Sequence, residues 1–185
     1  ADKDTTIYYT TDGSIPTKES NVYKEGILIR NNTDQKNVIN AVQNIVADWR
    51  DYEVLQEKAD KGMVIRAIAM DGKNYISEVV TATYLVGLDR YKDCKVISVT
   101  ADPEKLIGDN GIFVTGPQYD AWYIDSDMAK DGAFEIGFTT NYETTNFWLS
   151  SRQNEVLGNV QIFENGEEYL NQKTMAQIQQ QQLAL

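Results

Sequence analysis

The chain has 185 residues, 42% of them hydrophobic, which is enough to bury a core in one large or two small domains. Its net charge of −11 argues against nucleic acid or an anionic membrane as a partner. Histidine is absent, which excludes a Ser-His triad, a histidine general base and every histidine-ligated metal site.

The chain has a single cysteine, Cys94, so it can form neither an internal disulfide nor a cysteine zinc site. We predict that Cys94 is a small core residue beside a strand, the usual place of a free cysteine. No apolar run approaches the roughly 20 residues of a membrane-spanning helix.

The first 88 residues show short strand patterns separated by turns. Asp12 and Gly13 lie in a dense turn sequence, so the motif Thr-Thr-Asp-Gly is better explained by turn geometry than by catalysis. Short strands spaced by turns predict a β-sandwich. The predicted strands are residues 7–10, 22–23, 27–29, 63–69 and 78–86.

Residues 33–60 interrupt these strands with a helical pattern. Val38, Val42 and Ile45 recur at helical spacing, and Thr33 or Asp34 can cap the start. We therefore predict an inserted amphipathic helix that packs on the sandwich. A partner-binding helix is the alternative interpretation of the same stripe.

A short polar link after residue 86 marks a domain boundary, with residues 1–88 on one side and residues 89–185 on the other. The second part begins with a predicted strand, a helical turn at Pro103 and another strand, followed by an irregular region over residues 117–132. Asn165 and Gly166 predict a tight hairpin. The predicted strands are residues 95–99, 112–114, 134–139, 147–149, 159–164 and 174–179. The fold class is therefore mainly β, a sandwich followed by a smaller, β-rich α+β segment.

Two clusters in this second part are candidate binding sites. Tyr119, Trp122, Tyr123 and Trp148 form an aromatic group that either stacks on sugar rings or anchors a long loop to the core. Asp125, Asp127 and Asp131 form an acidic loop with oxygen ligands for calcium, although its spacing departs from the EF-hand pattern.

The first part resembles the chitobiase/β-hexosaminidase C-terminal repeat, also called the fibronectin-III-associated repeat. The resemblance rests on Ile-Tyr-Tyr-Thr-Thr-Asp-Gly-Ser-Ile-Pro-Thr at residues 7–17, Val-Ile-Arg-Ala-Ile-Ala at residues 64–69 and Ser-Glu-Val-Val-Thr-Ala-Thr-Tyr at residues 77–84. It implies a β-sandwich module of the kind found in carbohydrate-active proteins.

The second part resembles the opening of the CotH family, the spore-coat-protein-H-like proteins of Gram-positive bacteria. Asp-Pro-Glu at residues 102–104, Leu106, Asp109 and Gly-Ile-Phe-Val at residues 111–114 match the spacing of that family's first segment. The family's later Gly and Ser-Arg motif is missing, because this chain reads Met-Ala-Gln-Ile-Gln at residues 175–179.

The CotH resemblance implies a parent protein that is an atypical Ser/Thr protein kinase using ATP and magnesium. The phosphate-binding lysine and the catalytic aspartates of such enzymes would lie beyond the matched segments, so we assign no catalytic residue and no cofactor to this chain. We predict a non-catalytic accessory or structural portion of a secreted or cell-surface protein, with the spore coat as one location. Its partners would be the rest of the parent protein, glycans, or surface and spore-coat proteins. The alternative is a carbohydrate-binding module.

Overall fold

The computed structural model describes residues 5–45, 52–54, 57–72, 76–125, 144–146 and 155–177. These residues form two compact units, each built from separate stretches of the chain. The first unit contains residues 1–36, 58–102 and 157–174, and the second contains residues 37–57, 103–156 and 175–185. The boundary predicted at residue 88 stays a prediction, because the units group segments that are far apart in the chain.

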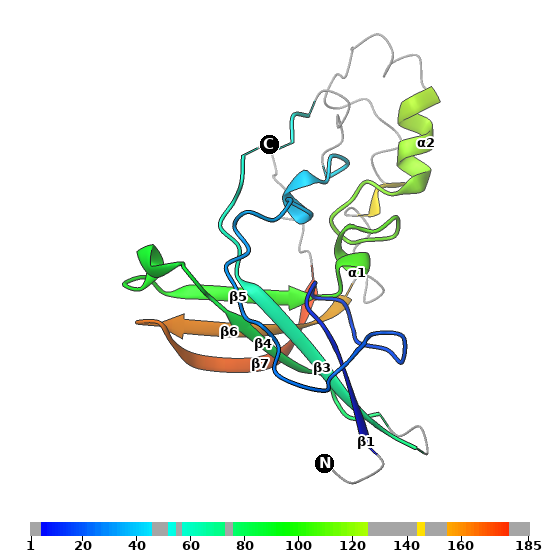
Figure 1. Cartoon of the computed structure of the whole chain (residues 1–185). Helices are drawn as coiled ribbons and strands as arrows, with labels where there is room; N and C mark the ends of the chain where they lie inside the picture. Colours follow the sequence, from blue (N-terminus) through cyan, green and yellow to red (C-terminus); the bar gives the residue numbers. More distant parts are fainter. Residues whose placement is uncertain are drawn as a thin grey trace. The chain divides into compact units, whose positions relative to one another are not determined.

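Strands dominate the elements labelled in Figure 1. The strands are β1 (Thr5–Thr10), β2 (Asn21–Val22), β3 (Met63–Asp71), β4 (Val80–Tyr84), β5 (Val96–Ala101), β6 (Glu155–Glu164) and β7 (Glu167–Gln177). The helices are α1 (Pro103–Ile107) and α2 (Pro117–Asp125), and the 3₁₀ turns are η1 (Ile39–Ala41) and η2 (Asp89–Tyr91).

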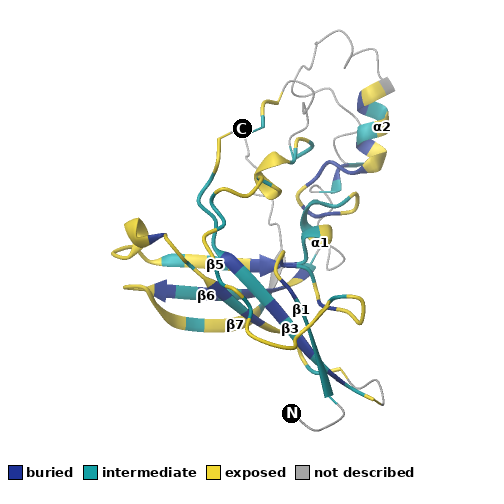
Figure 2. Cartoon of the chain, viewed as in Figure 1, coloured by how far each residue is buried: buried dark blue, intermediate teal, exposed yellow. Residues whose placement is uncertain are grey.

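The first sheet has the strand order β2-β1-β3-β4 and is antiparallel at each pairing. β3 is its central strand, with Thr10 opposite Arg66 on one side and Ala67 opposite Val80 on the other. Burial alternates along the second half of β3, so that Arg66, Ile68 and Met70 are buried while their neighbours are half-buried (Figure 2). This period of two is the pattern that predicted the strand.

The turn after β1 is held by its own side chains, as predicted. The Asp12 carboxylate accepts hydrogen bonds from the amide and the hydroxyl of Ser14, at 2.9 and 2.6 Å. Gly13 has a positive φ of 88°, and its carbonyl accepts a 2.9 Å bond from the buried Arg66 guanidinium. The Thr-Thr-Asp-Gly motif therefore stabilises the turn after β1.

The second sheet has the order β5-β6-β7. β5 and β6 are antiparallel, with Val96 opposite Phe163 and Ala101 opposite Gly158. β6 and β7 are joined at Asn165 and Gly166, whose positive φ values of 54° and 80° suit a mirror-image type I turn. The predicted hairpin is confirmed, and the two antiparallel sheets confirm the mainly β, sandwich-type fold.

In the second unit, the predicted strand at residues 112–114 is wrong. The amides of Ile112 and Phe113 bond to the carbonyls of Lys105 and Leu106, so these residues fold back on α1 and do not join a sheet. The region predicted to be irregular begins instead with α2, which starts at Pro117, a residue whose fixed φ suits the first helical position. The predicted strands at residues 134–139 and 147–149 lie outside the described residues.

The predicted helical insertion is corrected over residues 33–45, while residues 46–51 and 55–56 lie outside the described residues. Among residues 32–45, only residues 39–41 form a 3₁₀ turn, and Val38 and Ile39 are 65% and 54% exposed. β-branched residues and asparagines are weak helix formers, and the Asn44 carbonyl accepts a bond from the Thr115 amide at 2.8 Å. Tertiary bonding thus replaces the expected helical ladder there. Residues 27–29 are likewise not a strand, and Leu28 is 77% exposed.

Candidate binding cleft along strand β5

A cleft of about 480 Å³ runs along β5 in the first unit. Residues 94–98 all line it, and they are consecutive in the chain. Successive side chains of a strand point to opposite faces of the sheet. A cleft that is lined by consecutive residues therefore lies beside the edge of the strand, where both faces can be reached. The opposite wall comes from β3, β4 and the loop after β4, with Val64, Leu85 and Leu88 as apolar contributors. We call this feature the β5 cleft.

β5 lies at the edge of its sheet (Figure 1). In the described part of the chain it pairs with β6 only, so alternate backbone amides and carbonyls of residues 96–101 face away from β6 without a ladder partner. The β5 cleft therefore offers backbone hydrogen-bonding groups beside apolar side chains.

Polar side chains, two of them buried, connect the two sheets at the floor of the cleft. The Thr83 hydroxyl on β4 lies 2.8 Å from the Ser98 hydroxyl on β5 and donates at 2.8 Å to the Gln161 side-chain carbonyl on β6. The Gln161 amide then donates to Glu168 on β7. Gln161 is 1% exposed and Thr83 8% exposed. We call Thr83, Ser98, Gln161 and Glu168 the polar seam.

Two further bonds extend the connection between the sheets. The Asn171 side-chain amide donates to the Thr81 carbonyl at 3.2 Å, and Lys173 forms an ion pair with Glu78 at 2.6 Å. Thr81 lies on β4 and Glu78 just before it, whereas Asn171 and Lys173 lie on β7, so these bonds and the polar seam together fix how the two sheets meet.

One end of the cleft holds a charged cluster. Asp60 forms an ion pair with Arg90 and accepts a hydrogen bond from the Tyr91 hydroxyl. The Tyr91 bond and Arg90 together outweigh burial and hold the pKa of the Asp60 carboxyl below its usual value. The Arg90 guanidinium also lies over the Tyr91 ring, 5.0 Å from its centroid. Arg90 and Tyr91 both contact the Asp60 carboxylate, so the cluster shapes this end of the cleft.

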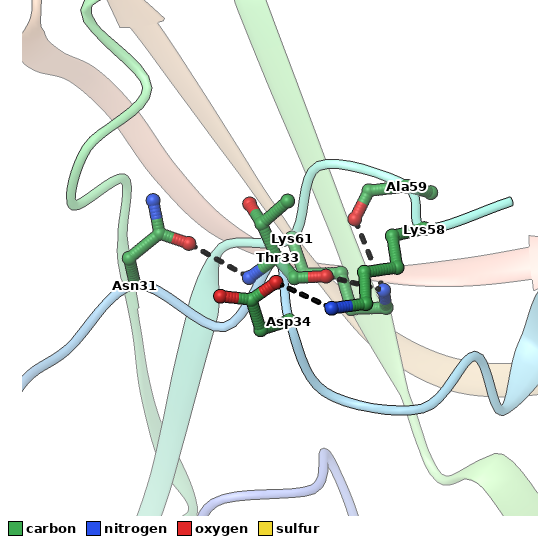
Figure 3. A network of polar contacts seen from close by, with 6 residues as sticks. All are labelled: Asn31, Thr33, Asp34, Lys58, Ala59 and Lys61. Atoms are coloured by element: carbon green, nitrogen blue, oxygen red, sulfur yellow. Dashed lines mark hydrogen bonds and ion pairs between the residues drawn. The ribbon is translucent and has the colours of Figure 1, made fainter.

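A clasp of polar contacts joins residues 31–34 to residues 58–61 (Figure 3). Asp34 and Lys58 form an ion pair at 2.7 Å, and the Lys61 ammonium donates to the carbonyls of Thr33 and Ala59, at 3.4 and 3.0 Å. The Thr33 amide donates to Asn31 at 2.7 Å. The clasp joins the end of residues 1–36 to the start of residues 58–102, the two stretches of the first unit that flank residues 37–57. It thereby holds the chain just before β3.

The solvent face of the second sheet is apolar next to the cleft. Ile97 lies opposite Ile162 and Val99 lies opposite Val160, and Ile97 and Val99 are 60% and 61% exposed. The usual arrangement of an antiparallel sheet, apolar inside and polar outside, is reversed at these positions, because the inner face carries the polar seam.

The predicted core position of Cys94 is wrong. Cys94 is exposed and lines the β5 cleft, in the bend between η2 and β5. Its amide bonds to the Tyr91 carbonyl at 2.9 Å, which ties the bend to η2 and leaves the side chain outside the core.

The predicted aromatic cluster is brought together only in part. Tyr119 and Tyr123 stack in α2 with ring centroids 5.9 Å apart, and Tyr119 lies 5.3 Å from Trp122. Tyr119 is 0% and Tyr123 3% exposed, which favours the anchoring interpretation for these two rings because neither offers a free face. Trp122 is half-buried, and Trp148 lies outside the described residues.

The predicted calcium loop stays a prediction. Asp125 is the last residue of α2, and Asp127 and Asp131 lie outside the described residues. Within the described ranges, no group of three or more acidic or cysteine side chains is placed to hold a metal ion.

Sequence reasoning missed the β5 cleft, because its walls come from segments up to 38 positions apart along residues 60–98. One clue was present in the sequence: residues 96–101 read Val-Ile-Ser-Val-Thr-Ala, without a charge or a proline to protect an edge.

Comparison with known proteins identifies the first part of the chain. Residues 1–84 match the family model described as Fn3 associated, which supports the resemblance to the chitobiase-type repeat. No curated protein and no solved structure matches the chain. Modules of this kind suggest an extracellular, carbohydrate-active protein. Within the described residues, no helix is long and apolar enough to cross a membrane.

Proposed function

We propose that this chain is a non-catalytic accessory portion of a secreted or cell-surface CotH-like protein. In this proposal the Fn3-associated sheet is a platform that holds the second sheet in a set orientation. The parent protein would carry the kinase activity with ATP and magnesium. A location in the spore coat and surface proteins as partners belong to the same proposal.

The polar seam is the observation that carries this proposal. Thr83 belongs to the segment that matches the Fn3-associated model, whereas Ser98 and Gln161 lie in the second part of the chain, residues 89–185, in which residues 102–114 resemble the CotH opening. Thr83 and Gln161, the two buried members of the seam, tolerate few alternative geometries, because a shift leaves a buried group without its partner. The seam therefore acts as an orienting joint between the two sequence segments.

ATP and magnesium provide the first test, on the complete 185-residue chain. We expect no saturable change in tryptophan fluorescence and no phosphate transfer to a general kinase substrate. A saturable ATP response that requires magnesium would contradict the non-catalytic assignment. It would show that the residues present form a phosphate site of their own.

Carbohydrate binding is the second candidate function, and the half-buried ring of Trp122 is the observation that favours it. A sugar ring can stack on one face of the Trp122 ring, but Tyr119 and Tyr123 are too buried to enlarge this stacking surface. A panel of bacterial and plant polysaccharides tests this candidate by fluorescence titration. Binding that Trp122→Ala abolishes, while Tyr169→Ala at a 71% exposed aromatic does not, would establish it. No response to any polysaccharide would leave the accessory role.

A further inference from the structure

The free edge of β5 lacks the features that normally protect an edge strand. Natural edges carry a charge, a proline or a bulge, which prevent pairing with another chain. β5 has no charged residue and no proline over Val96–Ala101, and its register with β6 is continuous. Four of its six residues are β-branched, which favours an extended backbone.

The β5 cleft gives room beside this edge. A strand added to β5 would lie in the plane of the second sheet, and its inward side chains would enter the cleft against Leu85 and Leu88. Its outward side chains would extend the exposed apolar face of Ile97 and Val99. An extended polypeptide would therefore form hydrogen bonds with the backbone groups of β5, place side chains in the cleft and extend the apolar face.

We propose that a second copy of this chain supplies that strand, so that two β5 strands pair antiparallel across a two-fold axis. Pairing centred on Ser98 places Ile97 of each copy opposite Val99 of the other. The outward apolar residues of β5 and β6 in one copy then join those of the other copy into one apolar band. Such an isologous contact is self-complementary, because every apolar outward residue meets another one.

The charge distribution permits this contact. Although the chain carries −11, most of the excess negative charge lies in the second unit, and acidic and basic residues are nearly balanced in the first unit. Lys95 and Asp102 flank β5 at its opposite ends, so antiparallel pairing brings the lysine of one copy to the end where the other has its aspartate. Opposite charges at the ends of paired strands favour this direction.

Sedimentation velocity of the complete chain over a wide concentration series tests the proposal. We expect a reversible monomer–dimer equilibrium. Val99→Lys places a charge in the middle of the apolar band and should raise the dimer dissociation constant about tenfold or more. Val38→Lys is the matched control, since Val38 is 65% exposed and lies outside the sheets, and it should leave the constant unchanged.

Hydrogen exchange of the unmodified chain gives an independent measurement. Amides of residues 96–101 should become more protected as the concentration rises, while those of β2, the edge strand of the first sheet, should not. A chain that is monomeric at every concentration overturns the proposal and leaves the edge to a strand from a different protein. A dimer that both lysine variants weaken equally, or whose protection appears elsewhere, also overturns it.

Discussion

Thr83→Val tests the polar seam most directly. The substitution keeps the shape of a side chain that is 8% exposed, and it removes the hydroxyl that donates to Gln161 at 2.8 Å. The Gln161 carbonyl, in a side chain that is 1% exposed, then lacks this donor. A buried acceptor without its partner costs about 1–3 kcal/mol. At about 2 kcal/mol, a chain of this length should lose about 4–8 °C in Tm.

Urea and thermal unfolding measure this loss, and Thr81→Val serves as the control. Thr81 lies on the same strand and is 5% exposed, and its hydroxyl makes no hydrogen bond to another described residue, so the same substitution should cost far less. The double variant Thr83→Val with Gln161→Leu should recover part of the loss, because both partners are then apolar and the exposed Glu168 is solvated by water. If Thr83→Val unfolds within about 0.5 kcal/mol of the unmodified chain, the seam does not hold the sheets together.

Two further predictions concern turns. Gly166→Ala should destabilise the chain by about 1–2 kcal/mol, because φ at Gly166 is +80°, which alanine adopts only at a cost. No atom lies within 4 Å of the added Cβ, so this cost comes from the backbone conformation alone. Gly72→Ala, where the added Cβ is equally free of contacts and φ is not in the positive range, should not show this loss in urea unfolding. At the first turn, burial raises the pKa of the Asp12 carboxyl, but the hydrogen bonds from Ser14 outweigh it and the pKa lies below its usual value. The stabilisation from Asp12 is therefore present above the unfolded-state pKa and is lost as pH falls through the folded-state value, so the stability difference between the unmodified chain and Ser14→Ala should shrink below about pH 4. If this stability difference stays constant down to pH 3, the hydrogen bonds to the Asp12 carboxylate do not stabilise the chain.

Local patterns predicted the elements whose geometry depends on neighbouring residues. The alternation over residues 63–69 predicted β3, and Asn165-Gly166 predicted the β6–β7 hairpin, because positive φ is a local property of those residues. The turn after β1 was predicted for the same reason, since Asp12 bonds within its own turn.

The tertiary structure decided what distant segments do to one another. The stripe from Val38 to Ile45 has helical spacing, yet Asn44 bonds to Thr115, which is 71 residues away. Residues 112–114 have the composition of a strand, yet the amides of Ile112 and Phe113 bond to carbonyls of α1. Tyr119 and Tyr123 looked equally suited to sugar stacking, and only their burial at 0% and 3% exposure distinguished the two interpretations.

The sequence by itself therefore determined β1, β3, β4, β5 and β6, the turns at Asp12 and at Asn165-Gly166, and the Fn3-associated segment, because each follows from side-chain periodicity and from backbone preferences within a few residues. The second sheet's polar inner face, the apolar outer face of Ile97 and Val99, and the cleft along β5 depend on which strands pair and which edges remain free. Only the packing of the two sheets decides that, since it sets which face of each strand is removed from water.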